Sequence, residues 1–193
     1  MPIEIEKKYR LTSEQKGILP GRLRAIGSQF VSAEFEENTL FKGETVKPGR
    51  SVLRLRLVGD RAILTYKERL PSPAAIKYQL EEETAVADPQ AMRGILTSLG
   101  FSPAVIYEKR RQTWRLRDVE IVVDELPFGW FMEIEGPEQE ISAVERELGI
   151  EGLMAEEATY PQLTLKLGTL CGAVVEARFA QSARDRTAES SDQ

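Results

Sequence analysis

The sequence of 193 residues contains no histidine and a single cysteine, Cys171. Without histidine, the chain lacks the side chain that most often acts as a general base near neutral pH and that most often binds transition metals. One cysteine cannot form an internal disulfide bond or a cysteine-based zinc cluster. A metal ion bound by this protein would therefore be held by oxygen atoms.

Long apolar runs are missing as well, and no stretch of the sequence is long and apolar enough to span a bilayer. The N-terminus enters a charged segment, MPIEIEKKYR, at once, without the basic and then apolar layout of a signal peptide. We therefore expect a cytoplasmic protein with no membrane partner. The formal net charge of −5 argues against non-specific coating of nucleic acid.

Length and composition predict a single domain. A chain of 193 residues with 41% hydrophobic content can bury one sizeable core but is short for two domains. We expect this domain to cover residues 1–179. Residues 180–193 lack apolar periodicity, and we expect them to be disordered.

Apolar and charged residues alternate in eight segments, which is the pattern of a strand whose two faces differ. Two of these segments are joined by Gly59-Asp60, a two-residue connection that favours an antiparallel hairpin. The eight expected strands cover residues 1–10, 34–41, 51–58, 61–68, 78–86, 105–117, 119–126 and 130–136.

Start and stop signals predict helices between the strands. Thr12 opens a capping box, but we expect Pro20 to break the helix that follows. An Asp-Pro start and a glycine end delimit a second helix, and a proline start and a glycine end delimit a third. These helices are expected over residues 12–27, 88–100 and 137–149, with a packing helix over residues 165–177 that contains Cys171.

The helices can cover the apolar face of the sheet, so the charged face must look into water or into a lumen. Eight antiparallel strands can close into a barrel wide enough to hold a small ligand. The predicted fold class is therefore α+β, an eight-stranded antiparallel β-barrel with helices packed on the outside. A lumen lined by both signs of charge is costly unless each charge has a partner, and a polyanion with divalent cations would supply partners for both signs.

Several short motifs, taken in order, resemble the CYTH family of triphosphate tunnel metalloenzymes. They are EIEKK, LRLR, LTYK, EKRR, VVDE and FMEIEG, and the resemblance covers roughly residues 1–167. It implies an eight-stranded tunnel that binds triphosphate compounds together with a divalent metal and usually hydrolyses them.

The resemblance also implies roles for individual residues. It places Mg²⁺ or Mn²⁺ among the carboxylates of Glu4, Glu6, Asp124, Glu133 and Glu135. It places the phosphates among the cations of Lys8, Arg54, Arg56, Lys67, Lys109 and Arg111, with Glu81 and Glu83 as further tunnel acids. Lys8 or the metal would activate the attacking water. From their phase and position we expect Arg115 and Arg117 at a solvated rim and Trp114 and Trp130 in the core.

Departures from the family pattern reduce the number of reactions that we expect this chain to catalyse. Class IV adenylate cyclases of the family carry a His-Phe pair, and mammalian-type thiamine triphosphatases carry a tryptophan where this chain has Val52. We therefore expect a metal-dependent hydrolase of a small triphosphate compound, above all inorganic triphosphate. The alternatives are a class IV adenylate cyclase, a thiamine triphosphatase, or a non-catalytic sensor of polyphosphate or nucleotide. The sequence does not indicate an oligomeric state.

Overall fold

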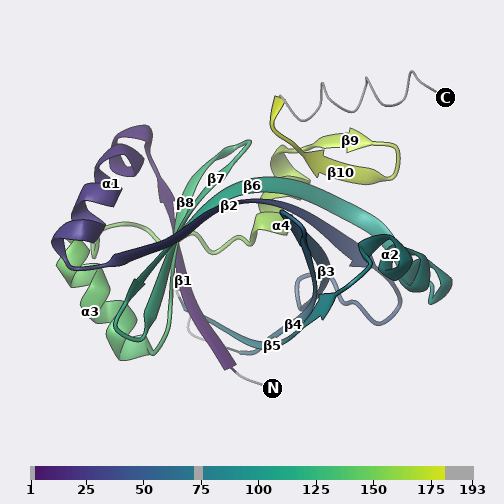
Figure 1. Ribbon diagram of the computed structural model, residues 1–193, viewed down its shortest axis with the longest axis horizontal. Helices are drawn as coiled ribbons and strands as arrows, with labels where there is room; N and C mark the ends of the chain where they lie inside the picture. The colour runs from purple at the N-terminus through teal and green to yellow at the C-terminus, as the bar shows by residue number, and fades with distance from the viewer. Residues whose placement is uncertain (1–2, 72–75, 181–193) are drawn as a thin grey trace.

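The computed structural model of the protein describes residues 3–71 and 76–180. The expected disordered tail lies outside this range, apart from Ala180. The elements of the described residues, labelled in Figure 1, are β1 (Ile3–Leu11), α1 (Ser13–Ala25), β2 (Gln29–Lys42), β3 (Ser51–Val58), β4 (Arg61–Arg69), β5 (Lys77–Val86), α2 (Pro89–Ser98), β6 (Ser102–Leu116), β7 (Val119–Leu126), β8 (Gly129–Glu135), α3 (Glu138–Leu148), α4 (Tyr160–Leu167), β9 (Thr169–Cys171) and β10 (Val174–Ala177).

Eight of the strands close into a ring, which confirms the predicted fold class. Their order is β2-β3-β4-β5-β1-β8-β7-β6, and β6 pairs with β2 to complete the ring. All of these pairings are antiparallel. Strand β1 pairs with β5 on one side and with β8 on the other, so its side chains have neighbours from both halves of the sequence.

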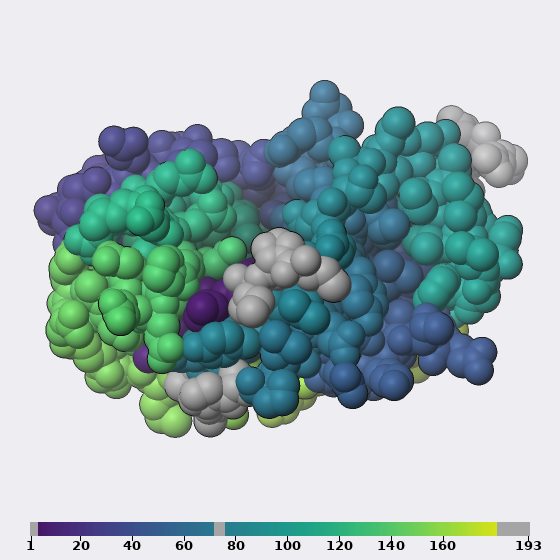
Figure 2. Space-filling model, turned by 90° about the horizontal axis from the view of Figure 1, so that it is seen from below, coloured from purple at the N-terminus to yellow at the C-terminus, as the bar shows by residue number. Residues whose placement is uncertain are grey.

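The helices cover the outer apolar faces of the barrel in separate places. Leu19 and Leu23 of α1 and Ile141 and Val144 of α3 pack in one core cluster, together with Trp114 of β6. A second cluster joins α2 to the outer faces of β2, β3 and β4. Figures 1 and 2 show α1 and α3 together at one end of the molecule and α2 at the other. The barrel interior is left to the opposite, charged faces of the strands.

The predicted starts of the first three helices are confirmed, but one predicted break is wrong. Thr12 forms a capping box with Gln15, and helix α1 then continues through Pro20 to Ala25. A proline inside a helix removes one backbone hydrogen bond. The buried side chains of Leu19 and Leu23 on either side of Pro20 pack into the core, and we infer that this packing offsets the lost bond.

The expected packing helix over residues 165–177 is also wrong. Helix α4 ends at Leu167, and the segment that follows is the β9–β10 hairpin, with Cys171 exposed. Gly172 turns the hairpin with a positive φ of 61°. A side chain at Gly168 would collide with backbone oxygens of Thr164 and Glu176 at 2.7 Å, so this tight exit from the helix requires glycine.

None of the helices within residues 3–71 and 76–180 is long and apolar enough to cross a membrane.

Candidate functional site

The charged faces of the strands meet inside the barrel, where they line a cavity of about 290 Å³. All of the predicted site residues except Asp124 are on its wall. They come from β1, β3, β4, β5, β6 and β8, so the closed ring brings together segments that are far apart in the sequence. The remaining wall is Leu40, Val52, Gln79, Tyr107, Glu120, Thr159, Tyr160 and Pro161.

Strand β1 shows how alternation positions the site. Its inward residues, including Glu6 and Lys8, line the cavity. The outward residues Lys7 and Tyr9 bind the carboxylate of Glu145 on helix α3, with a Lys7 Nζ to Glu145 Oε1 distance of 2.5 Å. The charged edge of the opening motif therefore faces the cavity, and its other edge anchors the strand to the helix layer.

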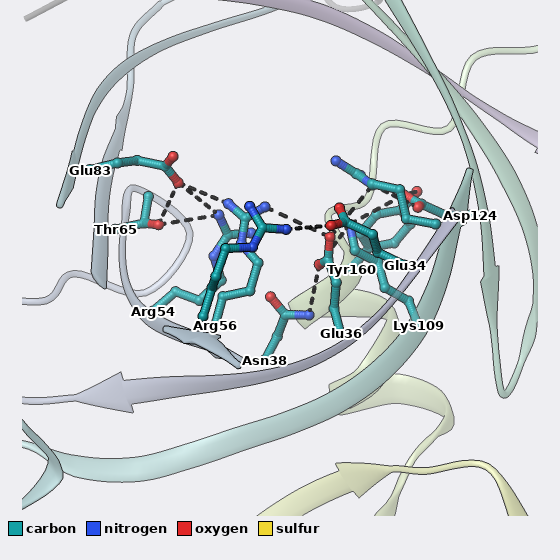
Figure 3. Close-up of polar contacts among 12 residues, drawn as sticks. Glu34, Glu36, Asn38, Arg54, Arg56, Thr65, Glu83, Lys109, Asp124 and Tyr160 are labelled. Carbon is teal, nitrogen blue, oxygen red and sulfur yellow. Dashed lines mark hydrogen bonds and ion pairs between the residues drawn. The ribbon is translucent and has the colours of Figure 1, made fainter. Parts of the chain in front are cut away.

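Four of the predicted phosphate-binding cations come from β3 and β6, the two strands that pair with β2, and line the cavity. Figure 3 shows three of them, Arg54, Arg56 and Lys109. Arg56 donates to Glu83 at 2.8 Å, and Arg54 lies 3.4 Å from the same carboxylate oxygen. Lys109 and Arg111 approach from β6, and both are ion-paired to Asp124. The Nε atoms of Arg54 and Arg56 are buried and have no hydrogen-bond acceptor among the described residues in this conformation.

Asp124 lies behind this group rather than on the cavity wall. It is fully buried, and it accepts hydrogen bonds from Arg111 Nε at 2.8 Å, Arg111 Nη2 at 2.6 Å and the Tyr160 hydroxyl at 2.9 Å. Burial alone would raise the pKa of Asp124, but the charges of Arg111 and Lys109 outweigh it and hold the pKa well below its usual range. In this conformation Asp124 anchors cations.

Carboxylates and lysines alternate on the other side of the cavity. Lys67 Nζ lies 2.6 Å from Glu4 and 3.0 Å from Glu81. Glu6 accepts from Lys77 at 3.0 Å. Lys8 Nζ lies 3.5 Å from Glu133, donates to the carbonyl of Ala158 at 3.0 Å, and sits 4.0 Å from the centre of the Tyr160 ring.

Several pKa values in this half are displaced. Burial lowers the pKa of Lys8 to about 8, against the opposing charge of Glu133. Burial and a hydrogen bond with Glu4 raise the pKa of Glu81 to about 7. Burial of the Glu135 carboxyl and the charge of Glu4 raise its pKa to about 8, although the Glu135 residue as a whole is exposed. Carboxylates this crowded hold protons that a cation can replace.

These carboxylates supply the oxygen donors that a hard divalent cation prefers, and their crowding fits such a cation. In the described part of the chain, however, no three acidic or cysteine side chains converge closely enough to hold a metal ion. Glu4 and Glu6 are held by Lys67 and Lys77 instead. Metal binding at the predicted ligands therefore requires carboxylates to exchange their lysine partners for the ion.

The structure adds charged and aromatic residues that the sequence prediction missed. Glu36 on β2 is buried among the cations, and Lys77 at the start of β5 is buried beside Glu6. Tyr160, the first residue of α4, reaches both Lys8 and Asp124. Glu36 shares the inward phase of β2 with Asn38, and this phase was the signal in the sequence that could have identified it.

The residues expected outside the site lie outside it. Arg115 and Arg117 have exposed side chains and do not line the cavity; Arg117 pairs with Glu140 and Glu147, and Arg115 pairs with Glu120, whose side chain also borders the cavity. Trp114 is buried in the core and Trp130 packs against it.

A model of the CYTH domain matches residues 2–159 of the chain. A protein of Methanocaldococcus jannaschii named "Putative adenylate cyclase" is 28% identical over 137 residues, which are 69% of this chain and 76% of that protein.

Solved structures share the fold. A Pyrococcus horikoshii protein has a TM-score of 0.73 and 27% identity, over 83% of this chain and 98% of that one. A Hippeastrum protein described as a "putative adenylyl cyclase" with a dominant triphosphatase activity has a TM-score of 0.64 and 18% identity, over 90% of this chain and 99% of that one. The second likeness concerns the fold alone.

Proposed function

Since the chain belongs to the CYTH family, we propose that it is a divalent-metal-dependent hydrolase of a small triphosphate compound, with inorganic triphosphate as the preferred substrate. The observation that carries this proposal is the cation group of the cavity. Its members line the cavity wall, and phosphate oxygens are acceptors of the right charge for guanidinium and ammonium donors; they are Arg54, Arg56, Lys109 and Arg111.

Cavity size favours a compact substrate. Its volume of about 290 Å³ is at the lower end of the roughly 300–1,000 Å³ typical of small-molecule sites. Tyr107 and Tyr160 are the aromatic residues among the described wall residues, and the ring of Tyr160 already faces Lys8. This arrangement favours a substrate held by its phosphates over one held by stacking of a base.

Transfer of a phosphoryl group requires mainly positioning and neutralisation of charge. In this proposal Arg54, Arg56, Lys109 and Arg111 bind the phosphate oxygens and fix the substrate along the cavity. Glu4, Glu6, Glu133 and Glu135 would hold Mg²⁺ or Mn²⁺. The ion would neutralise phosphate charge and polarise the attacking water.

Lys8 is the proposed proton acceptor. Its pKa of about 8 leaves part of the population neutral at pH 7 to 8, and its Nζ lies on the cavity wall beside Glu133. A neutral amine at this position can take the proton of the water that attacks the terminal phosphorus.

Adenylate cyclase is the second candidate, because the relative from M. jannaschii carries that name. Both reactions begin with a bound triphosphate, and the fold does not choose between them. Cyclisation also requires contacts that orient the ribose for attack on the α-phosphorus, and this chain has no histidine to supply the family's His-Phe pair.

The proposal is tested by measuring orthophosphate release from inorganic triphosphate, thiamine triphosphate and nucleoside triphosphates, each with Mg²⁺, with Mn²⁺ and with a chelator. We expect the fastest metal-dependent release from inorganic triphosphate. A sensor would instead show triphosphate-dependent thermal stabilisation without phosphate release, and that result would refute the proposed hydrolase.

A further inference from the structure

Glu36 is a buried acid in the middle of the cation group. Its side chain is almost fully buried on β2, with Oε2 3.3 Å from Lys109 Nζ and Oε1 3.8 Å from Arg56 Nη1 and 3.9 Å from Arg111 Nε (Figure 3). Burial alone would raise the pKa of Glu36, but the charges of Lys109, Arg111 and Arg56 outweigh it and hold the pKa at about 2. The carboxylate is therefore ionised.

The contacts of Glu36 are long for charge-assisted hydrogen bonds, which are typically about 2.7–2.9 Å. Its closest cation is 3.3 Å away, whereas Asp124 holds Arg111 at 2.6 Å. Each cation near Glu36 also has a second carboxylate partner. These partners are Glu83 for Arg56 at 2.8 Å, Asp124 for Arg111 at 2.6 Å and Asp124 for Lys109 at 3.4 Å.

This difference separates two roles for buried acids in the cavity. Asp124 positions cations through short hydrogen bonds, so its loss would free them to move. Glu36 adds negative charge beside Arg56 and Arg111, which Glu83 and Asp124 hold at shorter distances, and beside Lys109, which lies about equally far from Glu36 and Asp124. Removing the charge of Glu36 should therefore leave Arg56 and Arg111 near their present positions, with more of the charge of all three cations available to a ligand.

We propose that Glu36 is an internal counter-anion that competes with the phosphates of the substrate for Arg56, Lys109 and Arg111. This inference rests on the proposed function, because it takes these three cations as part of the phosphate-binding set. When phosphates fill the cavity, Glu36 opposes their binding by like-charge repulsion. When the products leave, Glu36 remains beside the three cations together with Glu83 and Asp124, so the emptied cavity keeps a counter-charge among its cations.

The Glu36 carboxylate is therefore expected to make the cavity select ligands by their negative charge and to speed the release of products. An anion must supply enough negative charge to outcompete Glu36, which favours a triphosphate over orthophosphate. A cavity without this carboxylate would bind all phosphates more tightly, products included. Glu36 is thus a specificity-determining residue that also limits product inhibition.

The test measures the binding of inorganic triphosphate and pyrophosphate by calorimetry in the presence of a chelator, with the wild-type protein and the Glu36→Gln variant. Glutamine keeps the shape of the side chain and removes its charge. We expect the dissociation constant for triphosphate to fall about tenfold, the size of effect that a partly screened unit charge a few ångströms away can produce. Pyrophosphate should also inhibit the variant at lower concentration.

Glu37→Gln is the matched control, since Glu37 is the next residue of β2 and pairs with Arg93 and Arg178 instead of the cavity cations. It should leave triphosphate binding unchanged. Asp124→Asn should weaken binding, because it removes the anchor of Arg111.

Unchanged or weaker triphosphate binding by Glu36→Gln, with binding by the wild type intact, would overturn this inference and leave the proposed function standing. No binding by the wild type with or without Mg²⁺ would instead refute the proposed function, and this inference with it. If Glu36→Gln is too unstable for calorimetry, the melting temperatures of the variant and the wild type are measured with and without triphosphate. The inference predicts that triphosphate raises the melting temperature of the variant by more than that of the wild type. An equal or smaller rise would overturn the inference.

Discussion

Arg111 offers the sharpest test of the buried charge network, because it links both halves of the cavity. Its guanidinium donates to both oxygens of Asp124, at 2.8 and 2.6 Å, and to Glu133 at 2.9 Å. Arg111→Met would keep much of the side-chain volume and remove the charge. Asp124, which is fully buried, would then keep Lys109 and the Tyr160 hydroxyl as its partners among the residues that the structure describes.

Removing one partner of a buried ion pair costs about 3–5 kcal/mol, because the remaining charge stays buried without compensation. For a protein of this size each kcal/mol lowers the melting temperature by about 2–4 °C, so we expect Arg111→Met to lower it by about 6 to 20 °C. Arg115→Met is the matched control. Arg115 is exposed and lies 3.8 Å from Glu120, and an exposed pair contributes about 0–1 kcal/mol.

The assay is urea unfolding of the metal-free protein, followed by circular dichroism. It is applied to the single variants Arg111→Met, Arg115→Met and Asp124→Asn and to Arg111→Met combined with Asp124→Asn. Neutralising both partners should recover part of the lost stability, because no unpaired carboxylate then remains at this position. Equal free energies of unfolding for Arg111→Met and Arg115→Met would refute the reasoning. So would a double variant whose loss of stability equals the sum of the losses of Arg111→Met and Asp124→Asn.

Three further outcomes are expected. Glu133→Ala should abolish phosphate release under saturating Mg²⁺ and keep the circular dichroism spectrum of the wild type; near-normal activity would rule out the proposed metal role. Arg54→Ala and Lys109→Ala should each weaken triphosphate binding by about 1.5–3 kcal/mol, while Arg117→Ala should have little effect, and equal losses in a binding titration would contradict the cavity assignment. The pKa of Glu81 is about 7 in the folded protein and about 4.3 in the unfolded chain. The folded state therefore binds the proton more tightly, and the contribution of Glu81 to stability falls as the pH rises from about 4.3 to 7. Glu81→Gln should therefore gain stability relative to the metal-free wild type across that pH window, and a difference that does not change with pH would show that Glu81 does not titrate there.

The sequence predicted the barrel and most of its cavity wall because both depend on a local pattern. Glu6 and Lys8 are two residues apart on a strand, so they must share a face whatever the strand's neighbours are. The helices cover the apolar face of this strand, so the opposite face, which carries Glu6 and Lys8, lines the cavity. The same reasoning placed Arg54 and Arg56 correctly on the cavity wall.

What the sequence did not predict depends on pairing between distant segments. Lys77 pairs with Glu6 only because β1 lies beside β5, a neighbour relation that alternation within one strand cannot supply. Tyr160 is separated from the last predicted strand by helix α3 and the segment after it. Its contact with Lys8 depends on how helix α4 packs against the barrel, which strand alternation does not predict.

Strand alternation also could not predict what each acidic residue contacts. Asp124 shares the inward phase of Glu120 and was expected among the metal ligands, but it lies behind the cavity wall and contacts Arg111, Lys109 and the Tyr160 hydroxyl. Glu36 stands in a run of acids, EFEEN, in which alternation places it on the same face as Asn38 but does not identify Lys109, Arg56 and Arg111 as the cations around it. Such assignments require the positions of the partner side chains.

The identity of the products formed from ATP tests the central claim most directly. The purified protein would be incubated with ATP and Mg²⁺ or Mn²⁺, and in parallel with inorganic triphosphate, and the products separated by ion-exchange chromatography. We predict orthophosphate from inorganic triphosphate, slower orthophosphate release from ATP, and no cyclic AMP. Cyclic AMP formed together with an equimolar amount of pyrophosphate would contradict the account and establish the cyclase reaction instead.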